Sequence, residues 1–164
     1  MSRLTQALNH DDRQALVLNI ALASGVAAIT NGAVLALLWD TIAARSPRPW
    51  FEPPAWVAGA VWLILLALVA SARWKLNSYT IIGVVPARRA ITTLIACCIL
   101  WPVYALAAGN PIVAFVGNTI TLAVAVTSTV MAWPRSQEAA LRIVPTFVWL
   151  LLATVIVVTE LGWL

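Results

Sequence analysis

Charged side chains are scarce in this chain. Only 10% of its 164 residues are Asp, Glu, Lys or Arg, whereas 62% are hydrophobic and the mean hydropathy is +0.93. A soluble domain carries roughly 25% charged residues. The deficit therefore excludes an ordinary water-soluble domain and indicates that lipid surrounds most of the chain.

Residues that carry catalysis or bind metals are almost missing. The single histidine, His10, lies in the polar N-terminal segment. Cys97 and Cys98 are adjacent inside an apolar run, and neighbouring residues on a helix point in different directions. We read both as small buried thiols. No metal site, fixed haem or catalytic residue is predicted, and the chain is not expected to be an enzyme.

Acidic residues lie near the ends of the apolar runs. Asp40, Glu52 and Glu160 are all expected near the external boundary, and none is a clear buried acid. Three interpretations of Glu52 stay open: a solvated loop acid, a contact for the cationic edge of a ligand, and a cap for the helix that follows.

Five apolar runs are long enough to cross a bilayer, since a spanning helix needs about 20 mostly apolar residues. They are Ala15–Trp39, Ala55–Trp74, Ala90–Ala108, Pro111–Trp133 and Arg142–Trp163. These runs consume nearly the whole chain and leave no room for a soluble domain. The sequence predicts an all-α integral membrane bundle of five helices, a single domain over residues 1–164.

Basic residues divide unequally between the two sides of such a bundle. With five spans, eight of the ten lie on the side of the N-terminus: Arg3, Arg13, Arg73, Lys75, Arg88, Arg89, Arg135 and Arg142. Only Arg45 and Arg48 lie on the other. By the positive-inside rule the N-terminus is expected to be cytoplasmic, in a bacterial cytoplasmic membrane. The net charge of +4 is thus explained by topology, and no nucleic-acid partner is predicted.

The first span contains a stripe of small residues. Ala28, Gly32 and Ala36 recur every four residues, a pattern that lets helices approach closely. Asn31 lies in the same segment, and either helix packing or a ligand contact accounts for it. The polar start of the chain lacks the pattern of a cleavable signal, so this span is expected to stay as an anchor.

The nine tryptophans fall into two groups. Six lie near predicted span ends, where indole rings anchor helices at the membrane surface: Trp39, Trp50, Trp56, Trp74, Trp133 and Trp163. Trp62, Trp101 and Trp149 lie about seven or more residues inside their spans, ~10 Å deep at 1.5 Å per residue. Their N–H groups need a partner in protein or ligand. Two interpretations stay open for them: the wall of a pocket for a flat ligand, or bulky filling of the bundle.

Prolines stiffen the segment that leads into the second span. Pro47, Pro49, Pro53 and Pro54 interrupt regular helix between Asp40 and Pro54. A stiff loop loses less entropy when it is held in one place. We expect Trp50, Phe51, Pro53 and Pro54 to form a lid over the mouth of the bundle.

Three motifs together resemble the translocator protein / tryptophan-rich sensory protein family (TspO/MBR). "RPWFEPPAWVAGAVW" resembles the family's proline-aromatic run and places Pro49, Pro53, Pro54, Trp56, Val57 and Trp62. "ILWPVYAL" is similar to its third-helix run and places Trp101, Pro102 and Tyr104. "RIVPTFVWLLLAT" is similar to its fifth-helix run and places Pro145, Trp149, Ala153 and Thr154.

The resemblance implies a five-helix membrane protein, commonly a homodimer, with a sensory, regulatory or ligand-trafficking role. It implies a bound porphyrin, other tetrapyrrole or sterol-like lipid, and a porphyrin-degrading side activity as a minor alternative. The implied ligand contacts are Trp62, Trp101, Trp149 and Ala153, with Cys98 and Thr146 at positions of family polar groups, under the lid formed by Trp50–Pro54.

Four positions depart from the family's pattern. Cys98 replaces an Asn, Leu66 and Thr146 replace Tyr residues, and Val157 replaces an Asn. The pocket is therefore expected to take a greasier molecule, or to have become a packing surface. On the second alternative the chain is a non-catalytic accessory subunit of a larger membrane complex, packed against partner helices, pigments or lipids.

Overall fold

The computed structural model describes residues 3–43 and 49–163, and these form helices joined by short turns, with no strand. Arg45 and Arg48, on which part of the charge argument depends, lie outside the described residues. The elements in chain order are α1 (Arg3–Leu8), α2 (Arg13–Ala43), α3 (Ala55–Lys75), the 3₁₀ turn η1 (Leu76–Ser78), α4 (Val84–Pro102), the π-helical turn η2 (Val103–Ala107), α5 (Pro111–Ala132) and α6 (Gln137–Glu160).

Five of these helices are long and apolar enough to cross a membrane, which confirms the predicted bundle. α3 and α5 begin at Ala55 and Pro111, as the apolar runs predict. α4 and α6 begin earlier than their apolar runs, because the basic pair Arg88 and Arg89 in α4 and the polar first turn of α6 are helical too. The Ser136 hydroxyl caps α6 by accepting from the backbone N–H of Ala139 at 3.2 Å.

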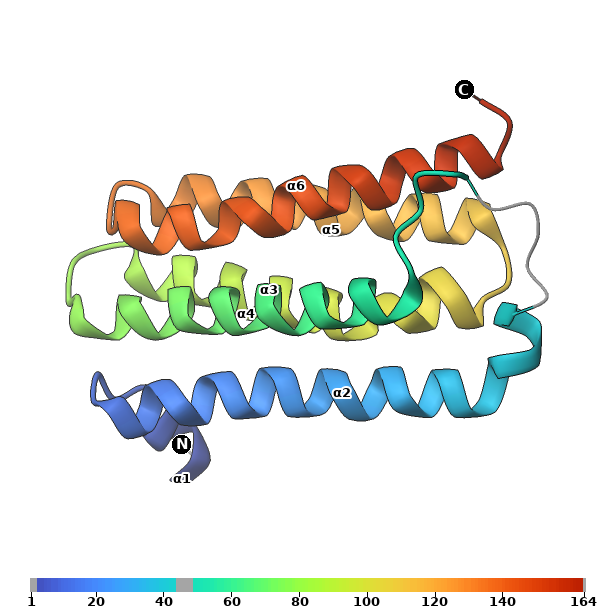
Figure 1. The fold of residues 1–164 in the computed structure, drawn as a ribbon. Coiled ribbons are helices and arrows are strands. Elements are labelled where there is room, and N and C mark those ends of the chain that lie inside the picture. The colour runs from blue at the N-terminus through green and yellow to red at the C-terminus, as the bar shows by residue number, and fades with distance from the viewer. Residues whose placement is uncertain (1–2, 44–48, 164) are drawn as a thin grey trace.

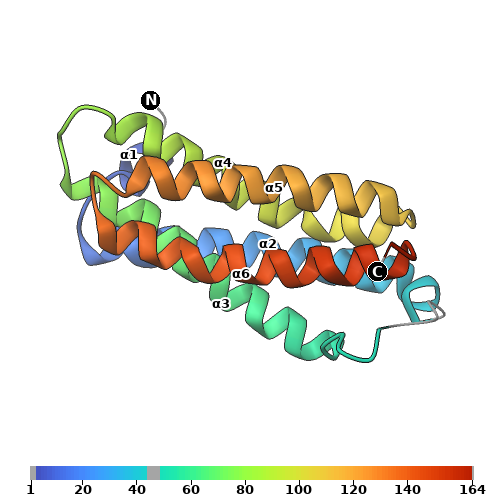
Figure 2. The same cartoon turned by 90° about the horizontal axis from the view of Figure 1, so that it is seen from above.

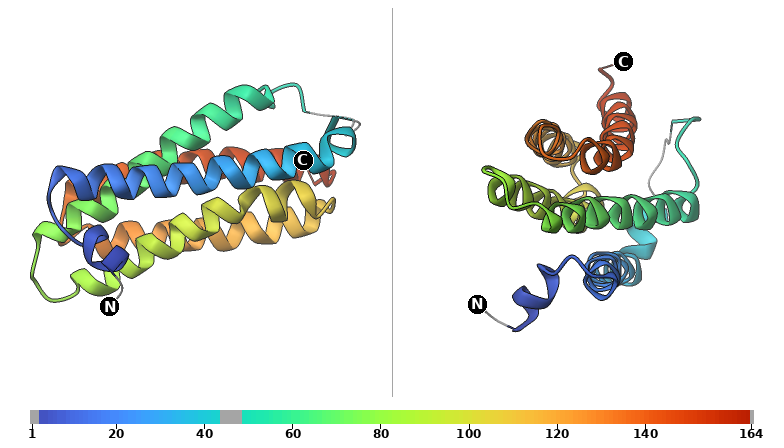
Figure 3. Two further views of the ribbon diagram at one scale, coloured as in Figure 1. Left: turned by 90° about the horizontal axis from the view of Figure 1, so that it is seen from below. Right: turned by 90° about the vertical axis from the view of Figure 1, so that its left-hand side faces the viewer.

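The helices stack in three layers. α5 and α6 form one layer, α3 and α4 the next, and α2 lies alone on the far side (Figures 1 and 3). Fully buried alanines such as Ala125 in α5 and Ala140 in α6 let the helices approach closely. α2 is the least covered of the five spanning helices, so most of its surface is left to face lipid.

The small-residue stripe of α2 points outward, away from the other helices of this chain. Ala28, Gly32 and Ala36 are exposed, and a Cβ added to Gly32 meets no atom within 4 Å. The buried face of α2 instead carries Ala23 and Ala27. Both faces are rich in alanine, so composition could not distinguish them.

The segment before α2 is tied to the ends of α2 and α3. The backbone oxygen of Leu8 accepts hydrogen bonds from Asn19, Arg73 and Asn77 at 3.0, 3.2 and 3.0 Å. The Arg73 guanidinium also donates to Oδ1 of Asn19 at 2.8 Å and of Asn9 at 2.9 Å. This polar cluster fixes α1 and the following turn across one end of the bundle.

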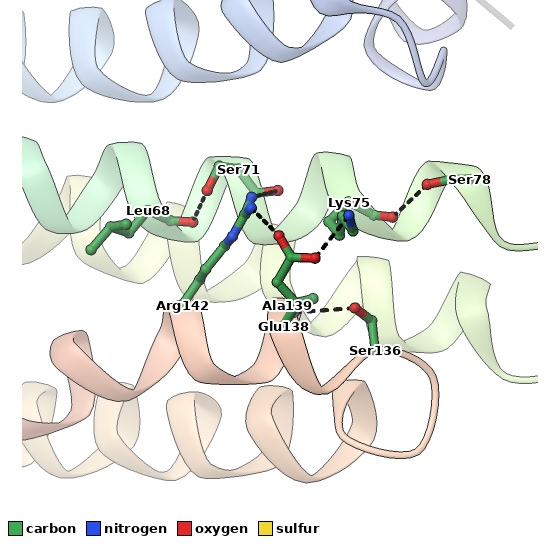
Figure 4. A network of polar contacts seen from close by, with 8 residues as sticks. All are labelled: Leu68, Ser71, Lys75, Ser78, Ser136, Glu138, Ala139 and Arg142. Carbon is green, nitrogen blue, oxygen red and sulfur yellow. Dashed lines mark hydrogen bonds and ion pairs between the residues drawn. The ribbon is translucent and has the colours of Figure 1, made fainter.

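A second polar cluster joins α3 to α6 at the same end. Glu138 lies between Lys75 and Arg142, with Lys75 Nζ 2.8 Å from its carboxylate (Figure 4). Arg142 also reaches the backbone oxygen of Ser71 at 3.4 Å. We call this end, with Arg73, Lys75, Arg88, Arg89, Arg135 and Arg142, the basic end.

Candidate functional site

Trp62 is buried in α3 and has the hydrogen-bond partner that its depth requires. Its Nε1–H donates to the backbone oxygen of Cys98 in α4 at 3.1 Å. In a regular helix that oxygen accepts from the N–H four residues later, which here is position 102. Pro102 has no N–H, so the carbonyl of Cys98 is left without its helical donor. The missing N–H of Pro102 thus creates the acceptor for the indole.

Trp101 lies beside Trp62. The two ring centroids are 5.4 Å apart with the planes tilted by 49°. The Nε1–H of Trp101 donates to Oδ1 of Asn118 in α5 at 3.1 Å. Asn118 is fully buried, and its Nδ2 has no partner among the described residues. The two indoles therefore form one fixed aromatic wall, held by protein groups on two different helices.

The π-helical turn η2 follows directly and presses α4 onto α5. The Tyr104 hydroxyl lies 2.9 Å from Oγ1 of Thr121, and the Tyr104 ring lies on Gly117. A Cβ at position 117 would come within 2.3 Å of that ring, so only glycine fits there. This contact fixes the stretch of α4 that carries Trp101.

A narrow void lies against the aromatic wall. Its empty volume is about 150 Å³, and it is nowhere wide enough for a water molecule. The lining residues are Trp62, Leu65, Leu66, Val69, Cys98 and Thr146. Thr146 is buried, and its Oγ1 has no hydrogen-bond partner among the described residues. The void is thus apolar except for one unused hydroxyl.

The remaining predicted contacts lie outside this void. Trp149 is half-buried and packs against the core about one helical turn beyond Thr146 on α6, and Ala153 is buried a further turn along. The structure therefore brings together Trp62, Trp101, Cys98 and Thr146, with Trp149 and Ala153 continuing the α6 face.

The expected lid residues do not line the void. Trp50 is 95% exposed and meets Phe51 edge-on at 5.7 Å. Pro53 is half-buried and Pro54 is exposed, and the segment runs outward with the start of α3 (Figure 2). Glu52 does not cap α3, because no side-chain cap hydrogen bond is made at its start among the described residues. One of its carboxylate oxygens is buried without a partner in the described residues.

The residue that sequence reasoning missed is Asn118. It lies seven residues into α5, where an amide in hydrocarbon must find a partner. That depth is the signal by which it could have been found. Nothing in the sequence marked Leu65 and Val69 as site residues, because a Leu or Val that lines a void cannot be distinguished by residue type from one in an ordinary core.

Comparison with known families agrees with this geometry. The family model of the TspO/MBR family matches residues 15–163, nearly the whole chain. The chain belongs to the TspO/MBR family. No curated protein sequence matches this TspO/MBR member. Five membrane-spanning helices and the family together show an integral membrane protein.

The departures from the TspO/MBR pattern converge in space. Leu66, Cys98 and Thr146, which replace larger or more polar residues of that pattern, all line the void. Val157, the fourth departure, is buried farther along α6 and is not part of the lining. The void therefore lies where the resemblance implies smaller or less polar side chains than those of the family pattern.

Proposed function

We propose that the chain binds a planar or polycyclic hydrophobic molecule, of the tetrapyrrole or sterol class, between α3, α4 and α6. The binding serves sensing, regulation or trafficking of that ligand in the membrane. The observation that carries the proposal is the Trp62–Trp101 wall beside a void with one unpartnered hydroxyl. An aromatic wall offers a flat apolar face, and Thr146 offers a single hydrogen bond that orients the ligand.

The site must open to admit such a ligand. Pockets for small molecules measure roughly 300–1,000 Å³, well above the present void. Trp62 is the first buried residue of α3, and before it in that helix the partly buried Val61 packs against the core. This half of α3 also diverges from the rest of the bundle (Figures 2 and 3). Outward movement of residues 55–61 therefore breaks few contacts and exposes the wall.

The proline-rich segment would move with this half of α3. Trp50, Phe51, Pro53 and Pro54 directly precede it, and Trp50 is free of the core in the present state. In the proposal these residues close over a bound ligand and bring their aromatic rings to its outer edge.

The experiment is titration of the detergent-purified chain with protoporphyrin IX, read by tryptophan fluorescence. We expect tryptophan emission to be quenched at micromolar porphyrin. When Trp101 is changed to Leu, the affinity for porphyrin should fall by about tenfold, or ~1.4 kcal/mol. Trp56→Leu is the matched control, because Trp56 is an exposed ring at the start of α3. Unchanged emission at micromolar porphyrin, or an equal loss of porphyrin affinity in the Trp101→Leu and Trp56→Leu variants, would reject the site.

One observation favours a second function, that of an accessory subunit. The void is too narrow for a water molecule, and large exposed tryptophans, Trp50, Trp56 and Trp39 among them, offer surfaces for partner helices or pigments. Native mass measurement after mild-detergent extraction distinguishes the two. A homodimer that retains a small hydrophobic molecule supports ligand binding, and a stable larger assembly supports the subunit role.

A further inference from the structure

One arm of the buried Asn118 amide in α5 has no hydrogen-bond partner. The indole N–H of Trp101 can only donate, so the atom that it reaches at 3.1 Å is the amide oxygen, Oδ1. The other arm, Nδ2, carries two N–H donors and has no partner among the described residues, although Asn118 is fully buried. Buried amides in native folds nearly always have partners, so this arm points to an acceptor on a bound molecule.

Asn118 lies at the edge of the Trp62–Trp101 wall and not behind it. The N–H bond of an indole lies in the plane of its ring, so the acceptor of that bond lies beside the ring. A flat ligand that rests on the face of Trp101 extends past the same edge. The part of the ligand that comes near Asn118 is therefore a peripheral group and not its ring system.

The level of Asn118 in the bundle is also that of an expected ligand contact. α5 and α6 are antiparallel neighbours joined by a short turn (Figure 1). Counted from that turn, Asn118 lies about 21 Å along α5, whereas Leu150 and Ala153 lie about 20 and 24 Å along α6. Thr146 lies about 14 Å along α6. The two unpartnered groups, Asn118 Nδ2 and Thr146 Oγ1, are thus separated by roughly 8 Å along the axis.

The helices around Asn118 carry no charge at this level. α5 has no charged residue, α6 has none between Arg142 and Glu160, and α4 has none after Arg89. An ionised group buried without a counter-charge is very unfavourable. Because Nδ2 can only donate, the group that it selects is an oxygen acceptor, and the neutral surroundings disfavour an ionised carboxylate.

We propose that Asn118 determines ligand specificity by donating a hydrogen bond from Nδ2 to a neutral carbonyl or hydroxyl oxygen of the ligand. The substrate class is then a polycyclic molecule with a keto, ester or hydroxyl group at its edge. The inference rests on the proposed function, because it concerns the same site. Asn118 has two tasks in it: Oδ1 positions Trp101, and Nδ2 binds the ligand.

The test compares two porphyrins that share a macrocycle. Protoporphyrin IX dimethyl ester carries neutral ester carbonyls at its edge, whereas etioporphyrin carries only alkyl groups. Each is titrated into the detergent-purified chain, and quenching of tryptophan emission is measured. We expect the ester to bind at least about tenfold more tightly, because etioporphyrin leaves the buried donor unpaired.

Two variants separate the arms of the amide. Asn118→Leu removes Nδ2, so the ratio of the two affinities should fall to about one. Trp101→Phe is the matched control, because it removes the indole N–H and leaves Nδ2 in place. It should change both affinities alike and keep the ratio near tenfold. Asn118→Ala repeats the test with a small side chain of the kind already buried on this face of α5, at Ala114 and Ala125.

Each result has a separate meaning. Equal affinity of the original chain for the two porphyrins would overturn this proposal and leave the proposed function standing. The absence of binding by either porphyrin would overturn both. A tenfold ratio that persists in Asn118→Leu and Asn118→Ala would show that another group selects the carbonyl. Because the ratio is taken within one variant, a loss of affinity common to both porphyrins cancels.

Discussion

A single proline explains how a tryptophan is tolerated deep in the bundle. Pro102 removes the donor that the Cys98 carbonyl expects, and the Trp62 indole supplies another at 3.1 Å. Each group alone would be an unsatisfied polar atom in hydrocarbon, and together they satisfy one another. The pair also joins α3 to α4 at the wall of the proposed site.

Trp62→Phe should show the value of that hydrogen bond. The ring remains, but the Cys98 carbonyl is left buried and unpaired, which costs about 1–3 kcal/mol of unfolding free energy. Trp56→Phe, at an exposed ring, should change stability by less than about 0.5 kcal/mol. Denaturant unfolding in mixed micelles measures both. Equal losses in the two variants would mean that the hydrogen bond contributes nothing.

Thr146→Val should separate stability from binding. Valine has nearly the same shape and removes a hydroxyl that has no partner in the described residues, so stability should rise by about 1 kcal/mol. Affinity for protoporphyrin IX should fall several-fold, because the orienting donor is lost.

Thr154→Val is the matched control for this prediction, since the Thr154 hydroxyl donates to the backbone oxygen of Leu150 at 2.7 Å. Its loss should not stabilise the protein. A larger loss of stability for Thr146→Val than for Thr154→Val would show that the Thr146 hydroxyl is already bonded.

Among the elements, α4 loses its regular geometry at its C-terminal end. It passes from α-helix through Pro102 into the π-helical turn η2, and such widened turns occur often at functional sites. The irregular stretch carries Trp101 and Tyr104 and packs against Asn118 and Thr121 of α5. The break in the helix therefore positions one side of the site.

Pro102→Ala should repair the helix and disturb the site. The new N–H competes with Trp62 for the Cys98 carbonyl, so Trp62 emission should shift and porphyrin affinity should fall several-fold. Pro145→Ala provides the control, because Pro145 is an exposed residue of α6. If Pro102→Ala binds porphyrin with the affinity of the original chain, the missing helical hydrogen bond at Pro102 does not position the Trp62–Trp101 wall.

α2 presents two faces with different expected roles. Ala27 is fully buried, and Ala27→Leu should overpack the core and lower stability by about 1–3 kcal/mol. Gly32→Leu should leave the single chain unaffected, since its Cβ meets open space. If the outward stripe joins two copies, Gly32→Leu should convert the dimer to monomer in analytical ultracentrifugation. An unchanged dimer would place the contact on another helix.

At the scale of the whole molecule, the two ends of the bundle differ. The basic end carries polar clusters around Arg73 and Glu138, whereas the other end carries the proline-rich segment. The orientation inferred from charge, with the basic end in the cytoplasm, remains a prediction. The asymmetry also separates the proposed ligand entrance from these polar clusters.

Labelling with a membrane-impermeant maleimide tests that orientation. A cysteine introduced at Gln137 should react only in inverted vesicles, and one at Trp50 only in intact cells. Cys97 and Cys98 lie within a spanning helix and should give little background. The opposite pattern would reverse the topology and place the basic end outside the cell.

The sequence by itself determined the five spans, the membrane class, the family and the need of two deep indoles, Trp62 and Trp101, for partners. These follow from hydropathy, length and the inability of hydrocarbon to accept an N–H group. Even the Trp62 acceptor was within reach, because a proline at 102 frees the carbonyl at 98.

Helix packing determined the features that the apolar sequence pattern leaves open. These are the buried face of α2, the meeting of Thr146, Cys98 and Leu66, and the exposure of Trp50. Such facts depend on the rotation and crossing of helices, which arise from contacts between residues far apart in the chain. Several arrangements satisfy the same apolar pattern, so only the three-dimensional packing distinguishes them.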